Sequence, residues 1–167
     1  MREKLTENDI KKIKEEIEYR KVVVRKEAIE AVKEARAHGD LSENFEYYAA
    51  KKDKNKNESR IRYLERMLKT AEVVSDESND DEIGINNAVE IKFLSDNRVA
   101  KYKLVTSVRG NSLNGYISIE SPVGKAILGH RIGDIVTIQV NDTMKYDVEV
   151  LSIDKTLNDD EDAIRSF

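Results

Sequence analysis

Apolar residues in the first part of the chain recur every three or four positions, which is the period of an α-helix. Residues 6–74 contain no proline and a single glycine, Gly39, with a helical pattern on both sides of it. Two helices with narrow apolar stripes and a tight connection predict an antiparallel coiled-coil hairpin over residues 1–75, with arms of roughly 48 Å. The stripes consist of Ile10, Ile13, Ile17, Val24, Ala28, Ala31 and Ala35 before Gly39, and of Tyr47, Ala50, Ile61, Leu64, Leu68 and Ala71 after it.

Two local features refine this hairpin. Thr6 is a good residue to cap the first helix, and Asp9 stands three positions later, as in a capping box. The first apolar stripe then skips one step near Arg20 and Lys21. In the second stripe, Lys54 and Asn57 are polar interruptions.

The pattern changes from helical to alternating beyond residue 75. Residues 76–84 are mostly acidic or small and predict a linker. Residues 85–155 predict a small domain with one short helix, in which Ser121 is the N-cap, Pro122 the first residue and Gly129 the stop. Residues 156–167 form an acidic tail, which we expect to be mobile. The fold class is therefore α+β, and the predicted strands are Ala88–Leu94, Val99–Val108, Gly115–Ile119, Ile135–Val140 and Lys145–Ile153.

Composition limits the possible functions. Charged residues make up 37% of the chain and there is no cysteine, which excludes disulfides and thiolate metal sites. No apolar run approaches the roughly 20 residues that span a bilayer, and the charged N-terminus is unlike a secretory signal, so we expect a cytoplasmic protein without membrane contact. Net charge is −4, yet residues 51–69 hold 8 basic and 3 acidic residues. This basic stretch is either a solvated helix face or a contact for a local anionic partner.

The connection between the two predicted helices contains two carboxylates, Asp40 and Glu43. One interpretation is structural, because Gly39 suits a helix end, Asp40 an N-cap and Glu43 the third position of a capping box. The other is chemical, because carboxylates three positions apart on a helical turn project from one face and are the oxygen ligands that Mg²⁺ prefers. Two carboxylates alone hold Mg²⁺ weakly, so the chemical interpretation requires a macromolecule that supplies further ligands. The chain has no phosphate-binding loop, dinucleotide fingerprint or nucleophile elbow.

Three stretches of the sequence resemble the Gre family of transcript-cleavage factors, of the GreA type. They are Ala35–Lys51, with the core His-Gly-Asp-Leu-Ser-Glu-Asn, Arg60–Glu65 in the second helix, and Ile119–Val136 in the C-terminal half. The similarity runs over roughly residues 5–153, in the same order and with the same spacing. Phe45 and Tyr48 depart from it, since they stand where the family usually has Ala and His.

The resemblance implies a coiled coil followed by an FKBP-like domain that docks on bacterial RNA polymerase. The coiled coil then enters the polymerase secondary channel, where Asp40 and Glu43 help hold a catalytic Mg²⁺ and backtracked RNA is hydrolysed. Ser42 fills the intervening motif position, and Arg36, Lys51 and Lys52 lie where they could face the 3′ end of the RNA. On this basis we expect a monomeric elongation factor that is not an enzyme by itself.

Two alternatives remain open. One is a channel-binding transcription inhibitor of the same fold, which the unusual Phe45 and Tyr48 keep open. The other is an FKBP-like chaperone, whose site is normally an aromatic-lined pocket. Neither the strength of cleavage, nor the preferred RNA fragment, nor the role of the acidic tail follows from the sequence.

Overall fold

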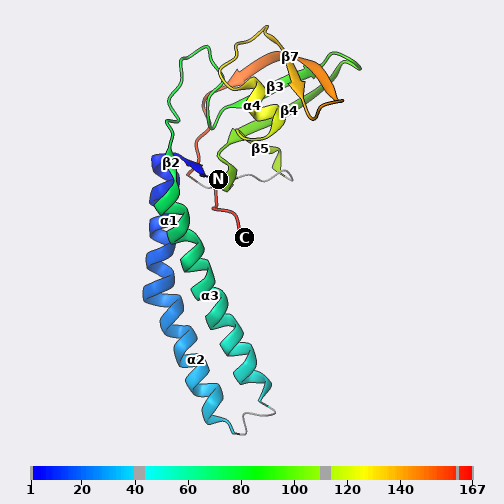
Figure 1. The fold of residues 1–167 in the computed structure, drawn as a ribbon. Helices are drawn as coiled ribbons and strands as arrows, with labels where there is room; N and C mark the ends of the chain where they lie inside the picture. Colours follow the sequence, from blue (N-terminus) through cyan, green and yellow to red (C-terminus); the bar gives the residue numbers. More distant parts are fainter. Residues whose placement is uncertain (1, 40–43, 110–113, 161, 167) are drawn as a thin grey trace. The chain divides into compact units, whose positions relative to one another are not determined.

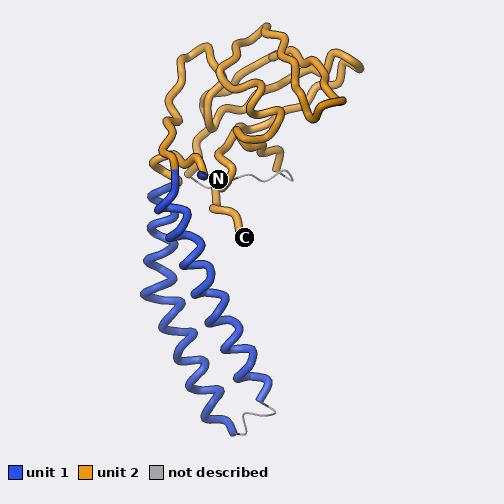
Figure 2. The backbone as a smooth tube through the Cα atoms, in the orientation of Figure 1, with its two compact units in different colours: residues 1–2, 10–71, 167 blue, residues 3–9, 72–166 orange. Residues whose placement is uncertain are grey.

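The protein is described here by a computed structural model, in which residues 2–39, 44–109, 114–160 and 162–166 are described. The chain divides into two compact units (Figure 2). The first unit consists of residues 1–2, 10–71 and 167, and the second of residues 3–9 and 72–166. Residues 3–9 and 72–75, which the prediction assigned to the hairpin, group with the C-terminal part of the chain, as do the predicted linker and the tail up to residue 166.

The first unit is a two-helix hairpin (Figure 1). Its first arm contains α1 (Glu7–Tyr19), a π-helical segment η1 (Arg20–Val24) and α2 (Arg25–Ala37), and its second arm is α3 (Phe45–Thr70). The apolar residues buried between the arms are Ile13, Ile17, Ala35, Ile61, Leu64 and Met67. Five of these six belong to the predicted stripes, and Met67 was not predicted. The other predicted stripe residues are half-buried, except Ala31, which is exposed.

The π-helical segment lies where the apolar pattern skips a step. A π-turn inserts one residue into an α-helix and rotates the following residues around the helix axis. The first arm thereby realigns its stripe between Ile17 and Ala35, both of which are buried. The irregular period at Arg20 and Lys21 is the sequence signature of this insertion.

A polar cluster occupies the middle of the hairpin. Arg60 and Asn57 are buried on α3, at 6% and 4% exposure. The Glu16 carboxylate accepts hydrogen bonds from Arg60 Nε at 2.9 Å and from Arg20 Nε at 2.7 Å. Arg20 Nη1 also donates to Asn57 Oδ1 at 3.0 Å, and Asn57 Nδ2 donates back to the Arg20 carbonyl at 3.3 Å. The interruption at Asn57 is thus part of the core, because its polar atoms have partners on the first arm.

The second unit contains a five-stranded sheet in the order β5-β4-β3-β7-β6. Within this sheet, as far as the structure describes it, β4 and β5 are the one parallel pair, and the other neighbours are antiparallel. All five predicted strands form, but the second ends at Val105, because residues 107–109 make a 3₁₀ turn, η2. A pair of two-residue strands, β1 (Lys4–Leu5) and β2 (Glu72–Val73), was not predicted. The sheet strands are β3 (Ala88–Phe93), β4 (Arg98–Val105), β5 (Tyr116–Ser118), β6 (Ile135–Gln139) and β7 (Lys145–Asp154).

The short helix α4 (Pro122–Ile127) forms as predicted. The Ser121 hydroxyl caps it by accepting from the Gly124 amide at 3.1 Å, and Gly129 follows it with a φ of +84°. Ile127 packs into the core of the sheet. Ile83, at the end of the predicted linker, belongs to the same core, and its amide donates to the His130 carbonyl at 2.9 Å.

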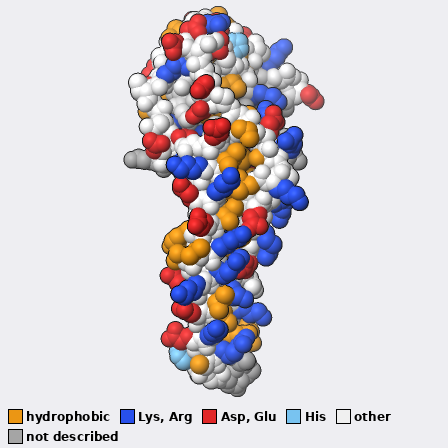
Figure 3. All heavy atoms as spheres, turned by 90° about the vertical axis from the view of Figure 1, so that its left-hand side faces the viewer, with side chains coloured by type: hydrophobic (Ala, Val, Ile, Leu, Met, Phe, Trp, Pro, Cys, Tyr) orange, Lys and Arg blue, Asp and Glu red, His pale blue; other side chains and the backbone are white. Residues whose placement is uncertain are grey.

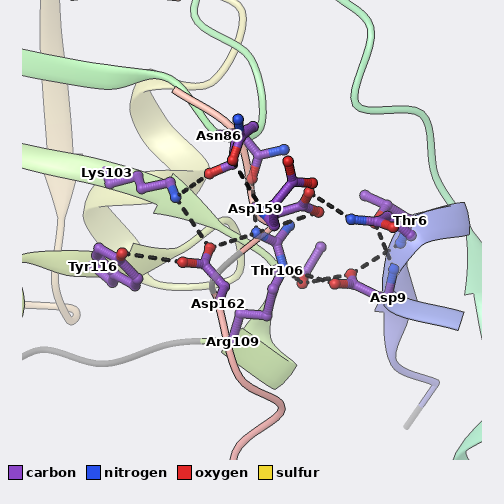
Figure 4. A network of polar contacts seen from close by, with 12 residues as sticks. Thr6, Asp9, Asn86, Lys103, Thr106, Arg109, Tyr116, Asp159 and Asp162 are labelled. Atoms are coloured by element: carbon purple, nitrogen blue, oxygen red, sulfur yellow. Dashed lines mark hydrogen bonds and ion pairs between the residues drawn. The ribbon is translucent and has the colours of Figure 1, made fainter. Parts of the chain in front are cut away.

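The N-terminal segment joins the second unit through a buried ion pair. The predicted capping box forms, since the Thr6 amide donates to Asp9 Oδ2 at 3.1 Å and the Asp9 amide to Thr6 Oγ1 at 3.2 Å. The same Asp9 carboxylate lies 2.6 Å from Arg109 Nε, and both side chains are fully buried (Figure 4). One aspartate therefore caps α1 and neutralises a cation of the C-terminal unit.

The acidic tail differs from the expected mobile segment. Asp159 is 5% exposed, and the Asp162 side chain lies 3.0 Å from both Lys103 Nζ and Arg109 Nη1. The tail is therefore bound to the second unit. The prediction of mobility rested on the acidic composition of the tail. It failed because the buried cations that bind the tail lie more than 50 residues away in sequence.

The predicted α+β class, with a helical hairpin followed by a small FKBP-like domain, is confirmed. Within the described residues, no helix is long and apolar enough to cross a bilayer.

The Glu16 cluster makes hairpin stability depend on pH. Burial raises the pKa of Glu16, but hydrogen bonds from Arg60 and Arg20 outweigh it and leave that pKa below its usual value. Its contribution is fully present above the unfolded-state pKa of about 4.3 and is lost as pH falls through the lower folded-state pKa. We expect Glu16→Gln to cost about 2 kcal/mol at pH 7, because Arg60 keeps its charge without a carboxylate.

Urea unfolding followed by circular dichroism, between pH 7 and pH 3, measures this effect. Glu15→Gln, at an exposed neighbouring position, is the matched control and should change stability by less than about 0.5 kcal/mol. Equal losses for the two variants would mean that Glu16 stabilises the hairpin only through its negative charge, and not through its hydrogen bonds to Arg60 and Arg20.

Candidate functional site at the hairpin tip

The tip is the connection between α2 and α3. α2 ends at Ala37, His38 is its C-cap, and Gly39 follows with a φ of +130°. Glycine suits this position, because residues with a Cβ are strained at positive φ. Asp40, Ser42 and Glu43 come next and lie outside the described residues. Their assignment as metal-binding and RNA-facing residues stays a prediction.

Asn44 is the N-cap of α3. Its Oδ1 accepts from the Tyr47 amide at 3.0 Å, and its Nδ2 donates to the Ala35 carbonyl at 2.6 Å. The structural interpretation of the sequence had assigned Asp40 as the N-cap of the second helix, with Glu43 as its partner in a capping box. The cap of α3 is instead supplied four residues later, so Asp40 is not required for it. Asn immediately before the Phe-Glu-Tyr-Tyr start was the available sequence signal.

Side chains on the two arms meet just below the tip. Arg36 Nη2 lies 3.4 Å from the Tyr47 hydroxyl, and the guanidinium lies 5.4 Å from the centre of the Tyr47 ring. His38 Nδ1 lies 3.1 Å from Glu46 Oε2. The hydrogen bond from Arg36, with a smaller effect of Lys51 and Lys54, lowers the pKa of Tyr47. The ends of α2 and α3 are therefore linked by specific contacts in a positive environment.

The basic stretch lies within α3 and begins at its second turn. Lys51, Lys52 and Lys56 are exposed and Lys54 is half-buried. Among the described residues, no carboxylate forms an ion pair with any of the four, whereas Glu58 and Glu65 further along α3 pair with Arg25 and Lys21. Figure 3 shows Lys and Arg side chains along one face of the hairpin. Within the described part of the chain, these lysines therefore offer positive charge that no ion pair neutralises.

Two aromatic side chains project into solvent beside these lysines. Phe45 is 84% exposed and Tyr48 is 53% exposed. They are three positions apart on α3 and so lie on one face. Tyr48 also makes an edge-on contact with Tyr47, with ring centres 5.6 Å apart. Of the three aromatics, only Tyr47 links the two arms, which leaves Phe45 and Tyr48 available to a partner.

A magnesium ion fits the donor set of the tip only in part. Asp40 and Glu43 are hard oxygen donors, but Mg²⁺ takes six ligands in octahedral geometry and keeps several waters. Among the described residues, no three His, Cys, Asp or Glu side chains lie close enough together to hold a metal ion. Two carboxylates would leave most of the six positions to other donors, so a magnesium site at the tip stays a prediction.

An FKBP-like chaperone would need an aromatic-lined pocket in the second unit. It has a cavity of about 450 Å³ with a largely polar wall and no aromatic residue in it. The lining residues are Asp76, Glu77, Ser78, Ile85, Asn86, Asn87, Lys155, Leu157, Asn158 and Asp159. This cavity does not offer the aromatic site on which the chaperone alternative depends.

Comparison with known proteins covers both halves of the chain. Residues 3–73 match the family described as transcription elongation factor, N-terminal, and residues 77–155 match transcription elongation factor GreA/GreB, C-term. The transcription elongation factor GreA of Lachnoclostridium phytofermentans is 44% identical, over 91% of this chain and 95% of its own length. That of Bacillus licheniformis is 40% identical, over 81% and 86%. Among solved structures, GreA factor homolog 1 of Thermus thermophilus is 28% identical over 92% of this chain and 99% of that one, with a TM-score of 0.42.

The Asn44 cap can be tested by substitution. Asn44→Ala removes the acceptor for the Tyr47 amide and the link to the Ala35 carbonyl, so we expect a loss of about 1 kcal/mol in unfolding free energy. Asn55→Ala, at an exposed interior position of α3, is the control and should be neutral or slightly stabilising because Ala favours helix. Thermal melts of both variants measure the difference. Identical melting temperatures would mean that Asn44 does not stabilise α3 as an N-cap.

Proposed function

The chain belongs to the GreA/GreB family of transcription elongation factors, and we propose that it acts on bacterial RNA polymerase by stimulating hydrolysis of backtracked RNA. In this proposal the hairpin enters the polymerase secondary channel and presents its tip at the active centre. The observation that carries it is the position of Asp40 and Glu43, in the connection between α2 and α3. The 26-residue α3 extends roughly 39 Å, which suits a structure that reaches into a channel.

The protein contributes side chains to a reaction that the polymerase catalyses. Asp40 and Glu43 would hold a Mg²⁺ ion jointly with polymerase carboxylates, and that ion would orient the attacking water or stabilise the leaving oxygen. The cap of α3 supports this role. Because Asn44 caps that helix, the Asp40 carboxylate is not needed as the cap and could serve as a metal ligand. In this proposal the two acids would hold the metal ion, and the attacking group would be water.

The basic residues next to the tip would guide the RNA. Lys51 and Lys52 are exposed on the first turns of α3, and Arg36 lies on the facing end of α2. Their charge complements a phosphate backbone, and contacts of this kind contribute affinity that falls as salt rises. Ser42 would lie between the two acids and face the same RNA 3′ end.

The C-terminal unit would supply most of the docking surface on the polymerase. It holds the larger core, whereas the hairpin is a thin two-helix structure. We propose that the factor works as a monomer in the cytoplasm, with the polymerase and the backtracked RNA as its partners.

One assay tests the proposed function directly. Purified protein is added with Mg²⁺ to stalled, backtracked RNA polymerase, and released 3′ RNA fragments are measured. Release of fragments followed by renewed elongation is the expected result. Occupancy of the channel without cleavage would instead identify an inhibitor of the same fold, a role in which the exposed Phe45 and Tyr48 would contact the channel wall.

Neutralising the lysines near the tip should weaken function without unfolding the hairpin. The variant carries Lys51→Gln, Lys52→Gln, Lys54→Gln and Lys56→Gln, and we expect it to need at least about tenfold more protein for half-maximal cleavage at low salt. The difference should shrink as salt is raised. A control variant changes four exposed lysines elsewhere in the hairpin, Lys11, Lys14, Lys26 and Lys69, to Gln. Equal activity of both variants at all salt concentrations would mean that the four lysines near the tip are only a solvated helix face without an anionic partner.

Substitution of the tip acids separates charge from capping. Asn caps a helix about as well as Asp, and Gln serves at the third position of a capping box as Glu does. Asp40→Asn and Glu43→Gln should therefore change the unfolding free energy by only a few tenths of a kcal/mol. Cleavage at saturating protein should fall by about a hundredfold or more, because neutral amides are poor Mg²⁺ ligands, while polymerase binding is kept.

Cleavage assays, polymerase-binding assays and thermal melts are run on both variants. Asp53→Asn, at an exposed position on α3, is the matched control for loss of one negative charge. If Asp40→Asn and Glu43→Gln cleave as fast as the parent, the acids have no part in the chemistry and the inhibitor becomes the better hypothesis.

A further inference from the structure

The acidic tail lies outside the region that the family shares, yet it is bound. The C-terminal family match ends at residue 155, and the tail follows it. Among the described tail residues there is no helix or strand. Asp159 and the side chain of Asp162 are nevertheless more than nine-tenths buried. Something in the second unit therefore holds them specifically.

Asp162 fits a site made of three donors from separate elements (Figure 4). Lys103 Nζ, from β4, lies 3.0 Å from Asp162 Oδ2, and so does Arg109 Nη1, from η2. The Tyr116 hydroxyl, from β5, donates to Asp162 Oδ1 at 3.1 Å. Burial raises the pKa of Asp162, but Lys103, Tyr116 and Arg109 outweigh it, so the pKa lies below its usual value. Both carboxylate oxygens are thus bound, and the charged form is favoured.

The walls of this site carry more positive than negative charge when the tail is left out. Lys103 and Arg109 are two cations, and, among the described residues outside the tail, Asp9 is the carboxylate that contacts Arg109. The Arg109 side chain is fully buried and that of Lys103 is 9% exposed, so the remaining charge needs an anion. The tail provides this anion through Asp162, and Asp159 lies 3.7 Å from Arg109 Nη1.

The tail is held mainly by side-chain contacts. Lys103 Nζ also binds the Asn158 carbonyl at 2.6 Å, and Asn8 Nδ2 donates to Asp159 Oδ1 at 2.6 Å. Among the described residues, one backbone–backbone hydrogen bond joins the tail to the rest of the unit, from the Arg165 amide to the Val108 carbonyl at 2.7 Å. The tail forms no strand of the sheet, so its release would leave the hydrogen bonds between the strands intact.

We propose that Lys103, Arg109 and Tyr116 form a receptor for an aspartate-bearing peptide strand, and that the tail is its exchangeable ligand within the chain. The tail is tethered to β7, so its effective concentration at the site is high, in the millimolar range or above for a short linker. A free acidic peptide therefore binds only when the carboxylates of the tail are neutralised. Because Arg109 also contacts Asp9, the ligand in this receptor sets how firmly the start of α1 is held.

The test uses a fluorescent synthetic peptide with the sequence of residues 156–167 and full-length protein variants. Asp159→Asn with Asp162→Asn neutralises the tail and should bind the peptide at least tenfold more tightly than the parent does. Asp160→Asn, an exposed tail position, is the control for charge and should behave like the parent. Binding should weaken as salt is raised, and a peptide with Asn at positions 159 and 162 should not bind. Equal binding to parent, control and double variant would overturn the proposal.

A second measurement does not depend on the double variant and so remains informative if that variant folds poorly. Trypsin cleavage after Arg165 and Lys155 reports release of the tail in a chain with an intact acidic sequence. Lys103→Gln should speed cleavage at least several-fold, Lys103→Arg should restore the parent rate, and Lys101→Gln on the same strand should have no effect. Unchanged cleavage in Lys103→Gln, with circular dichroism like that of the parent, would overturn the proposal.

Discussion

The buried guanidinium of Arg109 is the constraint on which the second unit depends. A charge of this kind has no water around it, and its removal from water is repaid only by close partners of opposite charge. Those partners come from both ends of the chain, Asp9 near the N-terminus and Asp162 in the tail. Asn86 and Thr106 supply neutral contacts at 2.7 and 3.2 Å. Segments that are far apart in sequence therefore have to meet around one side chain.

A second buried charge plays a comparable part in the hairpin. Glu16 on α1 binds Arg60 on α3, and Arg20 links both to Asn57. Apolar stripes on two helices can slide by a turn at modest cost, whereas a buried arginine can be satisfied in only one alignment. The cluster lies next to the π-helical segment, where the apolar stripe alone specifies the alignment least. Polar contacts thus define the register at the point where hydrophobic packing is irregular.

The facing ends of α2 and α3 combine specific contacts between the two arms with exposed basic side chains. Asn44 caps α3 and ties it to the end of α2, while Arg36 and Tyr47 join the two arms. This frame delimits the connection that holds the two acids and places exposed lysines directly after it. A rigid support with outward-facing charge is what a factor needs if the rest of its site belongs to another macromolecule.

The local elements were determined by the sequence itself. The helical period, the Thr6 and Ser121 caps, the break at Gly39 and the alternating strands all rest on interactions between residues a few positions apart, which a pattern records. Even the π-helical segment is visible in the sequence, as a break in the apolar period near Arg20 and Lys21. The motif around Asp40 and Glu43 indicated the family for the same reason, because its residues are contiguous.

Only the tertiary structure decided which charged residues are buried and with what. Arg109, Lys103 and Asp162 look like ordinary surface charges in the sequence, and their pairing joins positions more than 50 apart. The tail was expected to be mobile because its composition is acidic, but buried cations bind it. The α3 cap moved from Asp40 to Asn44 because the connection between the helices is longer than the motif suggested. Pairings of this kind depend on the path of the chain through space, which local periodicity does not encode.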